Sequence, residues 1–494
     1  DTPITDVFRM ISDLTGWSIM TSPAVTADPP KINLWVRLLL GSLTLLCLGL
    51  AFRERATGPR RRWWVRLSLT LVQLAVGLCL FAVLLWMHAS GYITALIVSP
   101  TAALVWAVVE GAVLAGCAWW AWRRPSWRPW ALGISATALF VGSFMFIVLT
   151  TWMWFPPSPD VCQAVVRPGQ VERLSPAEWA QEPSQPYSLL YIPEEGWLMG
   201  AFKMGGTGVL SFWNEPSANR VLGVDTRAPS RTGVMSFHGR KFPMHMTYRP
   251  ETRELLVSRM GPGVHSVDLL NLAKFPEMTL VRATDIDFAP HDVVTHPSAS
   301  AFGVLGQHGD FALIGESELE ERYRLYLGLS GDHVPVPLYA WHQPGTSKLY
   351  ISMLVYPFAE LDLDTQEVRR TRELFGGGQL NAEPGASEIF HTDILFDRVD
   401  VIDLESLSVT RTIDLDYTPR PIQVDTSRDL LIVGDWFGGV VNFYRLDTME
   451  ALDISVPVGP YVRDFAYDPA RGLLFTASKC GVYQVQVDAF VPAN

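Results

Sequence analysis

The chain lacks the short motifs that usually reveal chemistry. Its 494 residues contain five cysteines and no CxxC or CxxCH pair. Zinc ribbons, c-type haem attachment and thioredoxin-like redox sites are therefore excluded. No GxSxG or HExxH sequence is present, and the glycine run at 376–378 lacks the strand–loop–helix context of a phosphate-binding loop. We therefore predict no cofactor and find no recognisable catalytic set.

Negative charge predominates in the last two-thirds of the chain. Residues 1–155 carry a net charge of +6, whereas the whole chain carries −11, so residues 156–494 carry −17. An acidic domain of this size stays soluble and repels the phosphate backbone of DNA and RNA. Nucleic acid is therefore excluded as a partner.

Long apolar runs occur only in the first third. Four segments of mostly apolar residues are each long enough to cross a hydrocarbon core of roughly 30 Å. They are Leu34–Phe52, Leu67–Met87, Ala95–Trp119 and Ala131–Trp154. Tryptophans cluster at their ends, where amphipathic rings prefer the membrane–water boundary. The pattern predicts an N-terminal all-α transmembrane bundle of four spans over residues 34–155, with the lipid bilayer as its partner.

The arginines between these segments predict the orientation. Six lie in the first connector and three in the third, while the second connector, at 88–94, has no lysine or arginine. By the positive-inside rule the first and third connectors are cytoplasmic. We therefore expect a multi-pass protein of a bacterial inner membrane, with both termini and the acidic part of the chain on the periplasmic side.

An amphipathic segment precedes the first span, within residues 1–33. Ile4, Val7, Phe8, Ile11 and Leu14 recur at helical spacing, and polar residues occupy the other face. Such a helix lies at the membrane surface or against the acidic domain. The alternative is that it docks a partner subunit.

Residues 186–494 show a repeat. Short apolar runs end in an acidic residue seven times, at intervals of 41 to 48 residues. These acids are Asp225, Asp268, Glu316, Asp362, Asp403, Asp447 and Asp488. A period of about 40–50 residues rich in short strands is typical of a β-propeller, and the count predicts seven blades. We interpret the acids as turn-formers that bind their own downstream backbone, rather than as calcium ligands.

Two segments resemble the YVTN-type repeats of seven-bladed propellers. They are DLLIVGDWFGGVVNFYRLDT at 429–448 and VGPYVRDFAYDPARGLLFTASKCGVYQVQV at 458–487, with a looser match at 347–365. The resemblance covers about residues 186–490 and implies blade construction. Families of this type include binding scaffolds, cofactor enzymes and hydrolases, so the fold alone does not select a function.

The innermost strands of a propeller line its central channel, where ligands usually bind. The segments predicted for this position lie at 243–246, 290–293, 337–340, 420–423 and 461–464. His245, His291 and His342 are candidate metal ligands there, because neutral imidazole binds transition metals. The alternative is that these histidines are hydrogen-bonded within their blades.

Ring closure is predicted to involve the linker at 156–185, in which Ser175-Pro176-Ala177-Glu178 marks a short helix. The chain ends too soon after Asp488 for an outer strand of the seventh blade. An open sheet edge invites aggregation, so we expect Val161–Leu174, through its Cys162–Val166 run, to pair with Val482–Val487.

Cys162 and Cys480 are the two cysteines of the acidic part, and a disulfide between them is a second hypothesis. If Val161–Val166 were the closing strand, Cys162 would lie near Asp488, beyond the roughly 7 Å Cα separation that a disulfide spans. Both outcomes stay open.

Taken together, these patterns favour a membrane-anchored extracytoplasmic propeller that binds or positions partner proteins, as an accessory or scaffold subunit of a membrane complex. One alternative is an extracytoplasmic propeller enzyme, either a metal-assisted hydrolase or a lactonase. Another is a transport or energy-transducing subunit, since Glu110 lies inside a predicted span and intramembrane carboxyl groups mark ion paths.

Overall fold

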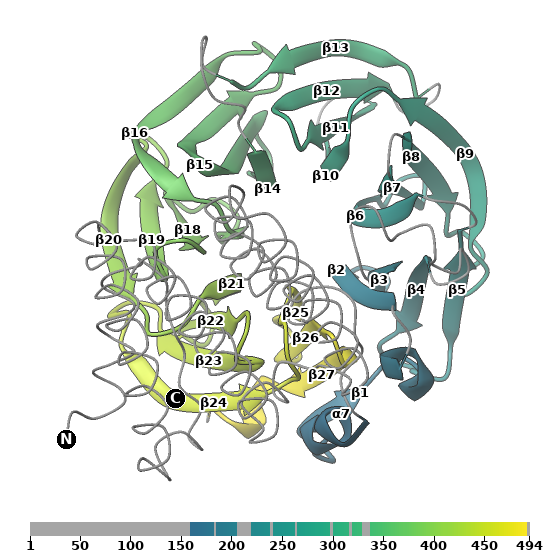
Figure 1. Ribbon diagram of the computed structural model, residues 1–494, viewed down its shortest axis with the longest axis vertical. Helices are drawn as coiled ribbons and strands as arrows, with labels where there is room; N and C mark the ends of the chain where they lie inside the picture. Colours follow the sequence, from purple (N-terminus) through teal and green to yellow (C-terminus); the bar gives the residue numbers. More distant parts are fainter. Residues whose placement is uncertain are drawn as a thin grey trace, which may run out of the picture. The chain divides into compact units, whose positions relative to one another are not determined.

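Seven β-sheets are arranged as a ring around a central axis (Figure 1). The computed structural model describes residues 159–181, 184–204, 219–237, 241–261, 264–296, 300–315, 319–328 and 336–491. Residues from Pro156 onward form one compact unit. The amphipathic segment at 1–33 and the four-span bundle at 34–155 lie outside the described residues. No helix in the described ranges is long and apolar enough to cross a membrane.

The strands follow the ring in chain order. The first blade contains β2 (Ser184–Ile192), β3 (Trp197–Met204), β4 (Arg220–Asp225) and β5 (Thr232–Ser236). The second contains β6 (Phe242–Arg249), β7 (Glu254–Gly261), β8 (Val264–Asn271) and β9 (Thr279–Ile286). The third contains β10 (Pro290–Thr295), β11 (Ala301–Gly306), β12 (Asp310–Gly315) and β13 (Glu321–Tyr326). The fourth contains β14 (Val336–His342), β15 (Lys348–Asp362) and β16 (Val368–Gly376).

The other three blades complete the ring. The fifth contains β17 (Leu380–Asn381), β18 (Glu388–Asp393), β19 (Arg398–Asp403) and β20 (Ser408–Asp414). The sixth contains β21 (Pro419–Asp425), β22 (Leu430–Asp435), β23 (Val440–Arg445) and β24 (Ala451–Pro457). The seventh contains β25 (Asp464–Asp468), β26 (Leu473–Ser478), β27 (Gly481–Gln486) and β1 (Val171–Arg173). The seven-bladed architecture predicted from the repeat is confirmed.

The burial of each strand follows from its place in the blade. Every residue of β11 and of β22 is buried, because neighbouring blades pack on both faces of these middle strands. The outermost strand β20 instead alternates between exposed and partly buried residues, which is the period-two pattern of a half-solvated strand. The long strand β15 folds back on itself: Leu363 N donates to Ser347 O at 2.8 Å, and Lys348 is paired with Glu360.

Most of the described repeated acids close turns, as predicted. Oδ1 of Asp225, Asp362, Asp403 and Asp447 accepts backbone N–H groups one to three residues downstream. Asp268 is an exception, and the turn prediction is wrong for it. It lies inside β8, fully buried, and forms a salt bridge with Arg259 at 2.6 Å. Glu316 lies outside the described residues.

The seventh blade is completed by a strand from before the first blade, as the missing outer strand predicted. The sheet order is β1-β27-β26-β25, with Val171 opposite Val485 and Arg173 opposite Tyr483. The strand comes from the expected segment Val161–Leu174, as Val171–Arg173, but the prediction that Cys162–Val166 forms it is wrong, because Cys162–Val165 belong to helix α7 (Pro159–Val165). Pro159 suits the first turn of a helix, and Pro168 with Gly169 makes the turn that leads into β1.

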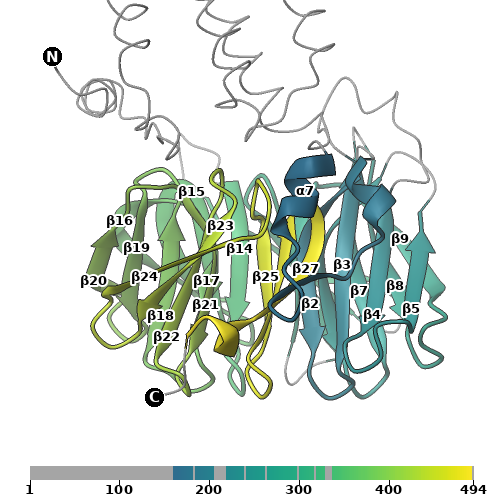
Figure 2. The ribbon, with the colours of Figure 1, turned by 90° about the horizontal axis from the view of Figure 1, so that it is seen from below.

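Helix α7 makes a disulfide possible. It lies at one end of the ring (Figure 2), and Cys162 and Cys480 are joined there, with 5.1 Å between their Cα atoms. The geometric objection assumed an extended strand at Cys162, which the helix replaces. The short helix expected after Ser175 is the 3₁₀ helix η2 (Ala177–Gln181), and a second one, η5 (Val487–Ala489), follows β27.

Hydrophobic packing continues across the closure. Leu189, Leu198 and Phe202 of the first blade share one buried cluster with Phe475 and Val482 of the seventh. Another cluster joins the sixth and seventh blades and contains Val171 of β1 and both disulfide cysteines. The ring is therefore closed by side-chain packing as well as by strand pairing, which holds the innermost strands at fixed positions around the channel.

Candidate functional site

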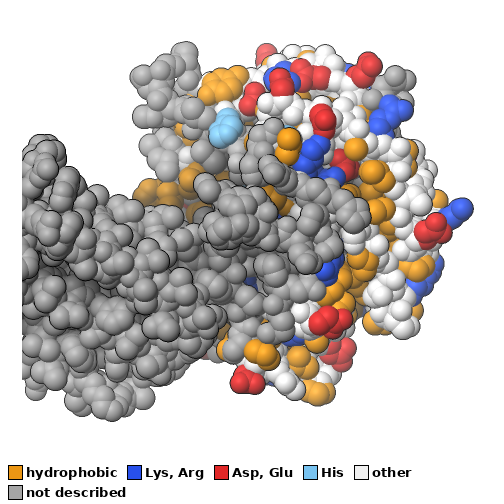
Figure 3. Space-filling model, turned by 45° about the vertical axis from the view of Figure 1, so that its right-hand side comes forward, with side chains coloured by type: hydrophobic (Ala, Val, Ile, Leu, Met, Phe, Trp, Pro, Cys, Tyr) orange, Lys and Arg blue, Asp and Glu red, His pale blue; other side chains and the backbone are white. Residues whose placement is uncertain are grey.

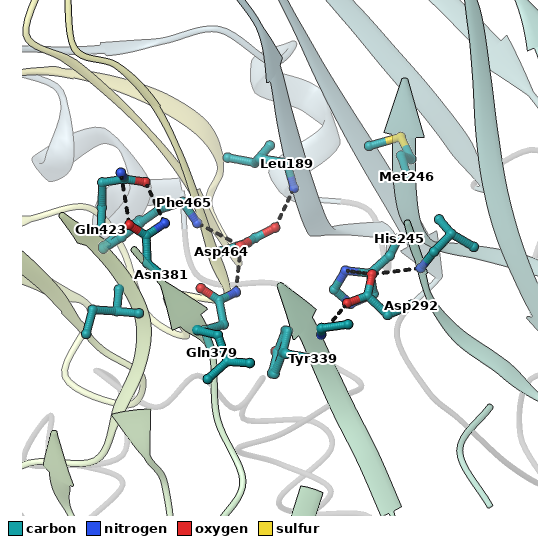
Figure 4. A pocket seen from close by; sticks show the side chains of 14 residues that line it. Leu189, His245, Met246, Asp292, Tyr339, Gln379, Asn381, Gln423, Asp464 and Phe465 are labelled. Carbon is teal, nitrogen blue, oxygen red and sulfur yellow. Dashed lines mark hydrogen bonds and ion pairs between the residues drawn. The ribbon is translucent and has the colours of Figure 1, made fainter. Parts of the chain in front are cut away.

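The central channel contains a cavity of about 200 Å³ that is lined by residues from all seven blades. Its lining includes Leu189, His245, Asp292, Tyr339, Gln379, Gln423 and Asp464. Figure 4 shows these side chains converging from different innermost strands. The inner-strand segments predicted at 243–246, 290–293, 337–340 and 420–423 all lie within these strands, and 461–464 leads into β25.

Two buried aspartates fasten the channel wall. Asp292 accepts hydrogen bonds from Val293 N at 2.8 Å and from Ala340 N, in the next blade, at 2.9 Å. Asp464 accepts from Leu189 N and from the side chain of Gln379, both at 2.6 Å (Figure 4). Burial raises the pKa of each of these two carboxyl groups to about 7. Their oxygens are occupied by protein donors, so their main role is to hold blades in position.

Two of the three predicted histidines come together in the channel. The rings of His245 and His291 are 5.0 Å apart between centroids. The hydroxyl of Tyr187 is hydrogen-bonded to His291 Nε2 at 3.0 Å. Tyr339 packs edge-on against both histidine rings. His342 does not join them. It lies at the far end of β14, where its Nε2 is bonded to Thr346 O at 2.7 Å, so its inclusion in the predicted group is wrong.

Buried cations surround the two histidines. Lys203 of β3 places its ammonium 3.7 Å from the centroid of the Tyr187 ring, and Arg463 lies 5.3 Å from the same centroid. Arg420 of β21 donates to the hydroxyl of Tyr339 through Nε at 3.0 Å and Nη2 at 2.8 Å. All three cations are at least nine-tenths buried. Desolvating three like charges in one region is costly unless an anion balances them.

Electrostatic coupling links these groups. Burial, Arg420 and Lys203 lower the pKa of His245 to about 3, so its imidazole is neutral. Burial, with Arg463 and Arg420 nearby, holds the pKa of Lys203 well below its usual range. Burial and Arg420 lower the pKa of Arg463 to about 10. The channel therefore carries a local positive field inside an acidic domain.

This field bears on the metal hypothesis. His245 and His291 provide two neutral imidazoles, but the described residues hold no group of three or more metal-ligating side chains. A divalent cation at these histidines would also sit beside Lys203 and Arg420, whose charges already oppose protonation of His245. The arrangement suits an anion better than a transition metal.

The cations were not selected from the sequence. Arg420 and Arg463 lie within the segments predicted for the innermost strands, at 420–423 and 461–464. An arginine at such a position could have indicated a charged group in the channel. Lys203 comes from the second strand of its blade and reaches the channel through its long side chain. No spacing in the sequence connects it with residues more than 200 positions away.

The comparisons find no relatives from which a role could be carried over. No family model matches the chain, and no curated protein is similar to it. The fold and the site define the described part of the chain as a seven-bladed β-propeller with a cation-rich central channel.

Proposed function

We propose that the chain is a membrane-anchored propeller of a bacterial inner membrane, whose periplasmic head binds or positions partner proteins as an accessory subunit of a membrane complex. The Cys162–Cys480 disulfide carries this proposal. Disulfides persist in oxidising compartments such as the periplasm and are rare in the cytoplasm. The arginine-rich connectors at 53–66 and 123–128 support the same orientation for the four spans.

The ring closure supports a positioning role. Strand β1 follows soon after the last predicted span and is built into the final blade by pairing with β27. Helix α7, which precedes β1, is cross-linked to the β26–β27 turn by the disulfide. These two attachments fix the start of the described head to its last blade, and a rigid head suits a subunit that holds a partner at a set position.

Binding is better supported than catalysis. The pair formed by Asp292 and His245, with Oδ1 and Nδ1 3.5 Å apart, is the feature closest to an acid–base couple. Both oxygens of Asp292 already accept backbone N–H groups, and the neighbouring cations disfavour the metal of a metal-assisted hydrolase or lactonase. The transport alternative depends on Glu110, which lies outside the described residues. The resemblance to YVTN-type repeats stays a sequence prediction.

Site-directed photocross-linking in native membranes tests the proposal. A photoreactive phenylalanine replaces Phe396, which is 57% exposed in the turn after β18, or Tyr326, which is 55% exposed on the outermost strand of the third blade. We expect a protein of the same membrane to cross-link at Phe396 in stoichiometric amounts, and a weaker product at Tyr326 as the matched control. A head that purifies without any cross-linked protein from both positions contradicts a partner-binding role.

A further inference from the structure

The positive charge of the channel is not balanced by the described residues. Lys203, Arg420 and Arg463 are 5%, 8% and 4% exposed, and none is in a salt bridge with a described carboxylate. Asp464 is the carboxylate whose charge reaches Arg420, but its oxygens already accept from Leu189 N, Phe465 N and Gln379. Arg420 is bonded to the Tyr339 hydroxyl, and Lys203 and Arg463 lie against the Tyr187 ring, but burying cations without a paired anion is costly, so the cluster is suited to an incoming anion.

Two buried nitrogen atoms in the cluster also lack a partner. Nε2 of His245 and Nε of Arg463 form no hydrogen bond with any described residue, and both side chains are more than nine-tenths buried. A buried polar atom left unpaired costs about 1–3 kcal/mol. Arg463 Nε is a donor, so the atom that satisfies it is an acceptor, whereas a neutral His245 whose Nδ1–H faces Asp292 presents Nε2 as an acceptor.

The cation cluster adjoins the cavity. His245 and Tyr339 line the cavity of about 200 Å³, Arg420 donates to the Tyr339 hydroxyl, and Lys203 and Arg420 act on His245. Arg420 therefore lies directly behind the lining residue Tyr339, while none of the three cations lines the cavity itself, which Asp292 and Asp464 also line. On the described part of the face drawn in Figure 3, basic and acidic side chains are interspersed.

We propose that the central channel binds a small, multiply charged oxyanion, with its charged groups between Lys203, Arg420 and Arg463 and the remainder of the ligand in the cavity beside His245 and Tyr339. Guanidinium groups suit carboxylate and phosphate oxygens alike. The ligands that fit are small molecules that carry either phosphate groups or several carboxylates, because both present negatively charged oxygens. This site is independent of membrane topology, so its test succeeds or fails separately from the proposed function.

Calorimetric titration of the purified full chain tests the site. Inorganic pyrophosphate is the phosphate probe and citrate is the carboxylate probe, each compared with sodium chloride at equal ionic strength. We expect saturable binding of at least one probe with one site per chain, and the stronger probe identifies the ligand chemistry. Heats that sodium chloride reproduces for both probes would mean general screening only and would overturn the proposal.

Lys203→Met and Arg420→Met are the informative variants, because methionine keeps an apolar stem without the charge. We expect each to weaken binding of the preferred probe by about tenfold or more, the loss that follows from one charge-assisted hydrogen bond. Arg411→Met is the matched control, since Arg411 lies on the outermost strand β20 and pairs with Glu388. Equal affinities for Lys203→Met, Arg420→Met and Arg411→Met would contradict the site.

The melting temperature of Lys203→Met distinguishes a lysine that binds the ligand from one that only stabilises the fold. Removing Lys203 removes the cost of burying an amine beside Arg463 and Arg420, so the ligand-free Lys203→Met variant should melt at or above the wild-type temperature and lose the probe-induced rise. A purely structural lysine would instead lower the melting temperature with and without probe.

The number of protons taken up when the anion binds also tests the site, because a lysine with only a packing role would not change it. The groups facing Lys203 are Tyr187 on β2, Phe242 and His245 on β6, His291 on β10, and the charges of Arg420 and Arg463. An anion placed there opposes the effects of burial and of the two arginines, and so raises the lowered pKa of Lys203. Binding should therefore take up protons in wild type, measured in buffers of different ionisation enthalpy, and take up fewer in Lys203→Met. Identical uptake in both proteins would exclude Lys203 from the site.

Discussion

The backbone N–H of Leu189 donates to Oδ2 of Asp464 at 2.6 Å, which joins the innermost strand of the first blade to that of the last. The same relationship joins the third and fourth blades, where Ala340 N donates to Asp292. At the outer edge of the ring, β1 pairs with β27. The first and last blades are therefore connected both at the channel and at the rim.

Asp464 should be essential to closure at the channel. Asp464→Ala leaves the buried N–H groups of Leu189 and Phe465 without their side-chain acceptor, and each unpaired buried donor costs about 1–3 kcal/mol. We expect the free energy of unfolding in urea to fall by about 3 kcal/mol. The control Asp414→Ala removes an exposed carboxylate at the end of β20 and should change it by less than about 0.5 kcal/mol. Similar values for both variants would show that the bond from Leu189 is dispensable.

Val171 should matter more than Val166, because only Val171 lies in the closing strand. Val171 is fully buried, whereas Val166 is 39% exposed. Val171→Ala should lower the free energy of unfolding by about 2 kcal/mol through lost burial and a residual cavity, while Val166→Ala should stay within about 0.5 kcal/mol. Urea denaturation of the two variants compares them directly, and the opposite order would restore the strand expected at Cys162–Val166.

The disulfide should stabilise the head substantially. It connects residues 318 positions apart, and a cross-link that closes so long a loop contributes about 2–5 kcal/mol. Replacing both Cys162 and Cys480 with serine should therefore lower the melting temperature. Dithiothreitol should lower it in wild type to a similar value and leave the double variant unchanged. A wild-type melting temperature indifferent to reductant would show that the bond contributes little.

His245 should make stability depend on pH below neutrality. Its folded-state pKa is lowered to about 3, so between the unfolded value of about 6.5 and pH 3 only the unfolded chain binds the proton. This contribution is present above about pH 6.5 and is lost as pH falls. Relative to wild type, His245→Gln should gain stability on acidification, by up to about 1.4 kcal/mol per pH unit. Urea titrations between about pH 5 and pH 7 measure the difference, and parallel curves would mean that His245 titrates normally.

The repeat predicted the blade count, because strand periodicity is visible in the sequence. The identity of the closing strand was not visible in the same way. Cys162–Val166 is apolar enough for a strand, but Pro159 favours a helix start, and Val171–Arg173 is too short to recognise before its partner is known.

The residues of the channel could be predicted from the sequence only where they lie on an innermost strand. His245 and His291 lie on innermost strands and were selected correctly as neighbours, whereas His342 lies on the same kind of strand but at its far end. Lys203 shows the limit most clearly. Its position depends on the length of its side chain and on the ring bringing the first blade beside the seventh, and neither is encoded by local spacing.

The orientation of the head tests the account most directly, and cysteine labelling in spheroplasts measures it. Glu405→Cys places a thiol in the exposed turn between β19 and β20, and Ala56→Cys places one in the first arginine-rich connector. With a membrane-impermeant maleimide we predict that Glu405→Cys is labelled in intact spheroplasts, whereas Ala56→Cys is labelled only after the membrane is opened, and that the parent chain is labelled in neither case. Labelling of Ala56→Cys in intact spheroplasts, with Glu405→Cys protected until lysis, would contradict a periplasmic head.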